Sequence, residues 1–208
     1  MYVHCTGHIL NLCLVDVSSR VQSVRNNFGI VSSLYNLIQG SAKRHKLFED
    51  IQIEAGLKCL SVKQLCETRW TCRWECLKVI LQRYSQIIET LQVMDGPEAF
   101  LLSNSLNTFD FIFHLLIMSE VYLITNIMSK FLQNSNISLT QALIQAKMTV
   151  ETLKAFRTDS EFERFYEISM KMCEENDIDP PKESRKKKVS SALLSLYSFS
   201  SLRNICVL

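Results

Sequence analysis

Apolar side chains along residues 74–91 repeat with the period of one helical face. They are separated by steps of three and four residues, and polar side chains fill most positions between them. The apolar set is Trp74, Leu77, Leu81, Tyr84, Ile88 and Leu91. This period predicts one amphipathic helix, which follows a loop-like lead beginning at Cys66 and ends before Asp95-Gly96-Pro97.

Helix is expected through most of the remaining chain. Only 5 Gly and 3 Pro interrupt 208 residues, so helix-breaking residues are scarce. A hydrophobic content of 47% with 21% charged residues is typical of a globular chain of one domain. No stretch shows the sustained apolar-polar alternation of a half-buried strand. We therefore predict a mainly α fold, with at most a short strand at residues 2–5.

Further helices are predicted from the same period and from their end signals. Residues 19–39 should form one helix that stops at Gly40, and Ser41 should cap the next, which ends at Gly56. Residues 57–68 are a connector, residues 98–106 a short helix or turn, and residues 109–132 a long apolar helix. Two capping boxes, at residues 138–141 and 158–161, open the last two helices. The first of these carries Ala142, Ala146, Val150 and Leu153 as its apolar residues.

The start of the chain predicts a buried helix. Residues 8–16 are apolar on most sides, so a helix there should be covered by other elements. A natural domain rarely begins inside its most buried segment, which indicates that the domain starts upstream and that this chain is a fragment. Its uncovered apolar residues are then expected to cause self-association; they are Ile9, Leu10, Leu12, Leu14 and Val15.

Charge and cysteine content limit the partners of the chain. A formal charge of +2 gives no support for nucleic-acid binding by the whole surface, so such a role needs a local patch. The 8 Cys follow no secretory signal, which favours reduced, packed thiols. Residues 109–128 contain Asp110, His114, Glu120 and Asn126, and therefore predict a buried helix and no membrane span.

The last 32 residues differ in character from the rest. Residues 177–181 contain two prolines and cannot be helical throughout. The basic run at residues 182–188 is a solvated linker, a phosphate contact or a nuclear-import signal. Residues 190–208 form a Ser- and Leu-rich tail that matches no neighbouring pattern.

Neither a metal site nor a catalytic site is predicted. Cys5 and His8 form half of a possible zinc site, but zinc needs four ligands and no second half is evident. Cys72 and Cys76 lie one helical turn apart, which leaves a site shared between chains open, although packing roles are favoured. There is no glycine-rich phosphate loop, no Gly-x-Ser-x-Gly, and no supported cysteine nucleophile.

DNA contacts are predicted at the start of the helix described first. A helix start offers unpaired backbone amides to a phosphate, and Arg69 can pair with the same anion. Trp70 is either a ring that stacks on a base or a core anchor, since both roles use the same side chain. Arg73 and Lys78 follow within two turns, so Arg69, Trp70, Arg73 and Lys78 are the DNA-binding hypothesis.

Three sequence blocks together resemble the hAT superfamily of DNA transposases. The first is Val3-His4-Cys5 with His8 and the Leu10-to-Asp16 segment, the second Leu65-Cys66-Glu67-Thr68-Arg69-Trp70, and the third residues 131–133 with residues 136–157. Their order and spacing are most similar to the domesticated, zinc finger MYM-type protein 1-like branch, which carries a DUF4371-type region. The basic run also resembles the linker of that branch.

The resemblance implies a helical insertion within a ribonuclease H-like catalytic fold. It assigns residues 2–5 to the end of a core strand, Cys5 and His8 to a family motif, and Trp70 to a ring that stacks on an extruded base. Family members cut and join DNA with two Asp, one Glu and divalent metal ions. The two Asp lie upstream of the Cys-x-x-His block, and the Glu lies beyond the insertion on a helix that the tail does not resemble. We therefore expect no enzyme activity and no cofactor.

These expectations define a domain division and a function. Residues 1–176 are the helical transposase-like part, residues 177–189 a basic linker and residues 190–208 a divergent tail. The expected function is an inherited role in DNA binding by a catalytically incomplete hAT-like chain, in the nucleus or otherwise the cytoplasm. The alternatives are a helical protein-interaction scaffold and a truncated product without function. A basic groove would favour DNA, and a large exposed apolar face would favour the scaffold.

Overall fold

The computed structural model describes residues 6–65, 70–134 and 136–181, and this part of the chain is mainly helical. Within it there are nine helices and no strand. They are α1 (Thr6–Arg20), α2 (Gln22–Gln39), α3 (Ala42–Glu54), α4 (Trp70–Gln82), α5 (Tyr84–Val93), α6 (Pro97–Leu106), α7 (Phe109–Leu132), α8 (Leu139–Ala155) and α9 (Asp159–Glu175). The predicted mainly α class is confirmed, whereas the predicted strand at residues 2–5, the basic run and the tail lie outside the described residues.

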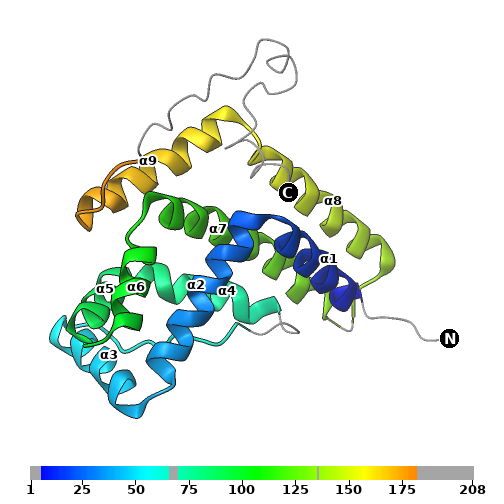
Figure 1. Ribbon diagram of the computed structural model, residues 1–208. Coiled ribbons are helices and arrows are strands. Elements are labelled where there is room, and N and C mark those ends of the chain that lie inside the picture. Colours follow the sequence, from blue (N-terminus) through cyan, green and yellow to red (C-terminus); the bar gives the residue numbers. More distant parts are fainter. Residues whose placement is uncertain (1–5, 66–69, 135, 182–208) are drawn as a thin grey trace, which may run out of the picture.

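The long helix α7 is the centre of the molecule (Figure 1). It contacts α1, α2, α4, α6, α8 and α9. Phe111, Ile112, Phe113 and Leu115 are buried in its first half, where helices cover several of its sides. Its N-terminus is fixed by Thr108, whose hydroxyl accepts a hydrogen bond from the Phe111 amide. The predicted bounds of this helix, residues 109–132, are confirmed.

By length and composition α7 is also a helix that could cross a membrane. Half of its most apolar window, 50%, is buried inside the protein. Core helices share this composition, so the sequence of α7 is weak evidence for a span.

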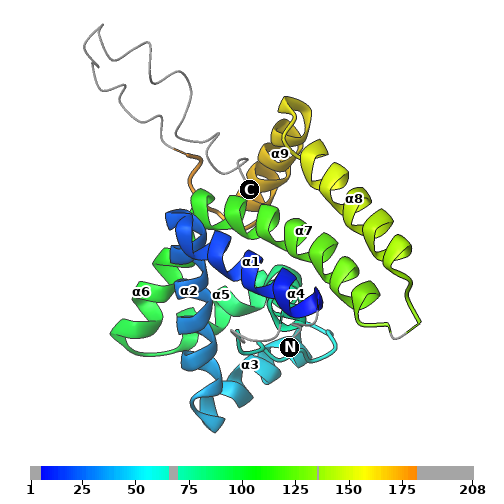
Figure 2. The same cartoon turned by 90° about the vertical axis from the view of Figure 1, so that its right-hand side faces the viewer.

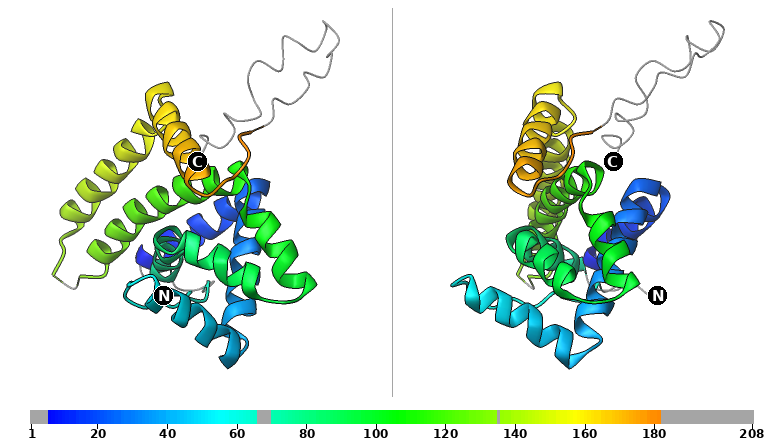
Figure 3. Two further views of the ribbon diagram at one scale, coloured as in Figure 1. Left: turned by 90° about the vertical axis from the view of Figure 1, so that its left-hand side faces the viewer. Right: turned by 60° about the vertical axis from the view of Figure 1, so that its left-hand side comes forward.

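Helices α8 and α9 form an arm on one side of α7, and the turn between α2 and α3 lies at the opposite end of the molecule (Figures 1 and 2). The α8 helix runs along the outer edge beside α7 in the left-hand view of Figure 3. The predicted capping box at Ser138 is present, because Ser138 and Gln141 each bind the other's backbone amide. At Thr158 only the threonine half forms, and Glu161 instead pairs with Arg164.

The prediction of one continuous helix through residues 74–91 is wrong, because this segment forms parts of two helices, α4 and α5. Arg83, at φ −125° and ψ 24°, separates α4 from α5. Its guanidinium donates from Nε to Gln52 Oε1 at 3.1 Å and from Nη2 to the Lys58 carbonyl oxygen at 2.8 Å. These contacts fix a non-helical residue in the middle of the apolar period. The period itself holds, since Leu77, Tyr84, Ile88 and Leu91 are buried on both sides of the break.

Two further predictions about the first helices are wrong. Residues 19–39 do not form one helix, because Val21 is extended at φ −85° and ψ 108° and separates α1 from α2. The α1 helix is not buried all round: Ile9 and Leu12 are 48% and 50% exposed, whereas Asn11 is buried. Ser41 precedes α3 as predicted, but its side chain makes no capping hydrogen bond.

Candidate functional site

The structure describes two of the four predicted DNA-binding side chains. Arg69 lies outside the described residues, and Trp70 opens α4 without a described side chain. Arg73 and Lys78 are described, and both lie on α4. Cys5 of the family motif is outside the described residues, and His8 lies in α1 without a described side chain.

Arg73 packs against other helices of the fold. Its guanidinium carbon lies 4.9 Å from the centre of the Phe28 ring on α2, a cation–π contact. Burial raises the pKa of the nearby Tyr122 hydroxyl, while the Ser18 hydroxyl and Arg73 act in the opposite direction. Arg73 therefore joins α4 to α2 and α7, and a phosphate contact would compete with these partners.

Lys78 lies in a different setting, beside the half-buried ring of Trp74. Its ammonium nitrogen is 5.0 Å from the centre of the Trp74 ring, and that of Lys130 on α7 is 6.0 Å from the same centre. Both lysines are exposed. We call Lys78 and Lys130 the α4–α7 cation pair. Two ammonium groups beside one indole can bind an anion such as a phosphate, with each cation–π contact contributing about 0.5–1 kcal/mol at an exposed site.

The largest group of exposed apolar side chains on a single helix in the described chain belongs to α8. Leu139, Leu143 and Val150 are 77%, 63% and 48% exposed, respectively. With Ala146 they follow at steps of four, three and four residues, which places them on one face of the helix. We call Leu139, Leu143, Ala146 and Val150 the α8 apolar stripe. On the other flank Ile144 and Met148 are also more than half exposed, at 55% and 58%.

The side of α8 that adjoins the stripe at Ala146 holds the helix on α7. Thr149 is buried and donates to the Gln145 carbonyl oxygen at 2.9 Å, and Leu153 faces a cavity beside α7. Val150, which the sequence grouped with Leu153 as apolar, instead lies toward solvent. The helix therefore has more apolar surface than α7 covers, and the rest remains available for another protein surface.

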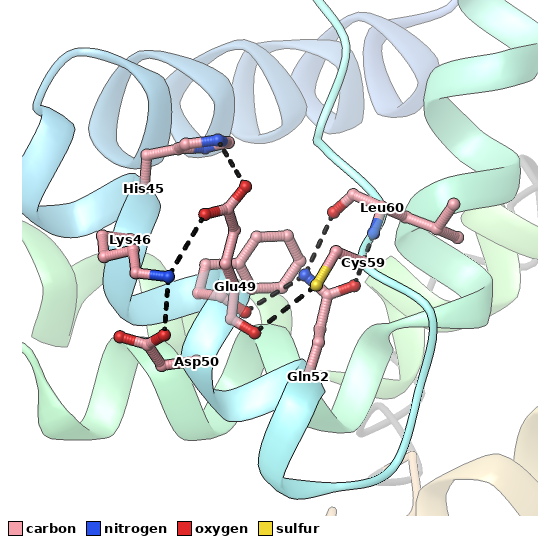
Figure 4. A network of polar contacts seen from close by, with 8 residues as sticks. His45, Lys46, Glu49, Asp50, Gln52, Cys59 and Leu60 are labelled. Atoms are coloured by element: carbon pink, nitrogen blue, oxygen red, sulfur yellow. Dashed lines mark hydrogen bonds and ion pairs between the residues drawn. The ribbon is translucent and has the colours of Figure 1, made fainter.

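The described cysteines and histidines do not form a metal centre. No group of three or more His, Cys, Asp or Glu side chains in the described ranges is placed to hold a metal ion. Burial raises the pKa of Cys76 from 9.0 to about 12, so its sulfur stays protonated at neutral pH and is a poor ligand. His45 faces Glu49 on its own helix, with Nε2 3.3 Å from the carboxylate oxygen Oε1 (Figure 4).

No protein-family model matches the chain, and no solved structure matches it. The hAT resemblance therefore stays a prediction from the sequence blocks.

Proposed function

We propose that this chain is a helical protein-interaction scaffold and that α8 is its docking element. The observation that supports the proposal is the α8 apolar stripe, where Leu139 and Leu143 expose most of their side chains. Folded monomers seldom expose a continuous apolar row on one helix, because covering it with protein releases free energy. The sequence analysis gave a protein-interaction scaffold as an alternative function. A basic groove would have favoured DNA binding, but Arg73 packs against the Phe28 ring, which weakens such a groove.

The stripe fits an α-helix as its partner. Steps of four, three and four place one apolar contact per turn, which is the spacing of two helices crossing at about 20°. Lys147 and Lys154 follow Leu143 and Val150 by four residues and border the stripe along one edge, and Glu151 lies farther round the helix. Because α8 is itself an amphipathic helix of this type, a second copy of the chain is the partner that we propose, with α8 packed against its counterpart.

Sedimentation of the full chain tests this proposal. The wild type should form dimers in the micromolar range. Leu143→Lys should raise the dimer dissociation constant at least ~50-fold. The reason is that a symmetric contact loses two leucines, each of which contributes about 1.5–3 kcal/mol when it is fully buried. Thr140→Lys adds the same charge on the polar side of α8 and serves as the matched control. A wild-type monomer at all concentrations, or equal weakening by both variants, would contradict the proposal.

A second candidate function is DNA contact, which the hAT resemblance implies and the α4–α7 cation pair supports. Lys78 and Lys130 are exposed, and the ammonium groups of both lie within 6.0 Å of the centre of the Trp74 ring. In this reading the lysines bind neighbouring phosphates, while the chain supports a catalytic core without itself supplying the metal-binding acids. Such contacts predict a binding constant that falls as salt concentration rises.

A further inference from the structure

A partly enclosed cavity lies between α1, α2, α7, α8 and α9. Its volume is about 140 Å³, and apolar side chains supply almost all of its wall. Phe156, Phe162 and Phe165 contribute aromatic rings, and those of Phe156 and Phe165 meet edge to face with centroids 5.9 Å apart. A dry apolar cavity of about 150 Å³ holds one benzene ring. A single ring is therefore the apolar group that this space fits.

Four polar or charged side chains also border the cavity, and three of them take part in hydrogen bonds of the fold itself. Ser18 donates to the Leu14 carbonyl oxygen and shares a hydrogen bond of 2.6 Å with the Tyr122 hydroxyl. His114 contacts the Asp110 carbonyl oxygen through Nδ1, and its Nε2 is buried, so a molecule in the cavity cannot reach that nitrogen. These three side chains are therefore poorly placed to bind a ligand.

Arg157 is the fourth, and it differs from the others. It follows Phe156 directly at the C-terminal end of α8 and is exposed, so the cavity reaches solvent beside it. Its side chain forms no ion pair or hydrogen bond with the described residues. Of the carboxylates that follow it, Glu161 pairs with Arg164, and Asp159 lies in the first turn of α9, where the helix dipole stabilises it. A guanidinium is therefore available at the mouth of an apolar cavity.

We infer that this cavity binds a small arylalkanoate, in which one aromatic ring is joined through one or two methylene groups to a carboxylate. The ring fills the apolar space, edge to face with the phenylalanines. The carboxylate pairs with Arg157, because the fork of a guanidinium matches its two oxygens. A monoanion fits better than a phosphate dianion, since Asp159 and Glu161 add negative charge at the start of α9. None of the four residues of the α8 apolar stripe lines the cavity, so this inference does not depend on the docking proposal.

Calorimetric titration of the full chain with phenylacetate and phenylacetamide tests the site. The two molecules have the same ring and nearly the same shape, but only phenylacetate carries a charge. Phenylacetate should bind the wild type roughly 5–10-fold more tightly, which is the gain expected from one charge-assisted pair at the protein surface. A ring-current shift of the methyl resonance of Met118, which lies on the α7 side of the wall, should locate the ring in the cavity.

Arg157→Gln should lower the affinity for phenylacetate to that for phenylacetamide and leave the affinity for phenylacetamide unchanged. Lys154→Gln is the matched control, because it removes the same charge from an exposed position in the last turn of α8 that does not line the cavity. Both affinities should be nearly unchanged in that variant. Both side chains are exposed, so neither substitution disturbs the packed core.

Val121→Phe fills the cavity from α7 and should abolish both the binding of phenylacetate and the Met118 shift. Failure of phenylacetate to bind the wild type would overturn the inference, as would equal affinities for phenylacetate and phenylacetamide. Equal losses in Arg157→Gln and Lys154→Gln would show a general effect of charge and would also overturn it. So would binding without a Met118 shift, because the ring would then lie elsewhere.

Discussion

Replacement of Gln52 by leucine should destabilise the fold more than its small change in shape suggests. Gln52 is fully buried, at 0% exposure, where α3 meets the connector that leads to α4 (Figure 4). Its amide nitrogen donates to the carbonyl oxygens of Phe48 and Leu60, each at 3.1 Å. Its Oε1 accepts from the Leu60 amide at 2.8 Å and from Arg83 Nε at 3.1 Å. One side chain thus links α3, the connector and the break between α4 and α5.

The magnitude follows from these contacts. Gln52→Leu removes four hydrogen bonds, each contributing about 0.5–1.5 kcal/mol net, and leaves backbone groups of Leu60 without their partner. The leucine offsets part of this loss, because burying its apolar side chain stabilises the folded state by about 1.5–3 kcal/mol. The net loss in the free energy of unfolding should be roughly 2–3 kcal/mol.

Urea denaturation followed by circular dichroism measures this loss, with Gln39→Leu as the matched control. Gln39 on α2 has a buried Nε2 without a hydrogen-bond partner in the described part of the chain. The same substitution there should leave stability unchanged or raise it slightly, because no hydrogen bond of that group is lost. If Gln52→Leu costs less than about 0.5 kcal/mol, or no more than Gln39→Leu, the reasoning about this junction is wrong.

Three further predictions concern ionisation, DNA and catalysis. Burial raises the pKa of Cys76 from 9.0 to about 12, so the unfolded chain loses this proton at a lower pH than the folded chain. The free energy of unfolding should therefore not depend on Cys76 below pH 9, and should fall by about 1.4 kcal/mol per pH unit from pH 9 toward pH 12. Denaturation at pH 8.5 and 10.5 should show this loss in the wild type and not in Cys76→Ala. For duplex DNA, Lys78→Glu and Lys130→Glu should each reduce the steepness of the plot of log binding constant against log salt concentration by about 0.9. Lys171→Glu on α9 should leave it unchanged. Equal slopes for all these variants would contradict the second candidate function. The purified chain should neither cleave nor join DNA with Mg²⁺ or Mn²⁺, and cleavage that copurifies with it and stops on chelation would contradict this.

Local sequence patterns were enough for most helices and their ends. The bounds of α7 and the capping box at Ser138 depend on residues within one or two turns, so a local period and local caps identify them. The breaks at Val21 and Arg83 were missed because the apolar period continues across both. At Arg83 the cause is a hydrogen bond to a residue 31 positions earlier, which no local pattern contains.

The candidate sites depended more strongly on distant contacts. Lys130 was missed because only the packing of α7 on α4 brings it to Trp74. The apolar residues of α8 were visible in the sequence, but periodicity does not show which apolar face a neighbouring helix covers. Arg157 has no signal of its own in the sequence; the cavity beside it comes from five helices that meet in the fold. The roles of Arg69 and Trp70 stay predictions.

Cross-linking through the α8 apolar stripe tests the docking proposal most directly. The chain would carry Ala146→Cys in a background where every cysteine except the buried Cys76 and Cys173 is serine, and a short bis-thiol reagent would be added. Ala146 lies near the middle of the stripe, so two antiparallel copies bring their introduced thiols together. Covalent dimers are expected for Ala146→Cys, and few are expected for Glu151→Cys, which lies away from the stripe. Equal yields from both positions, or no dimer from either, would contradict it.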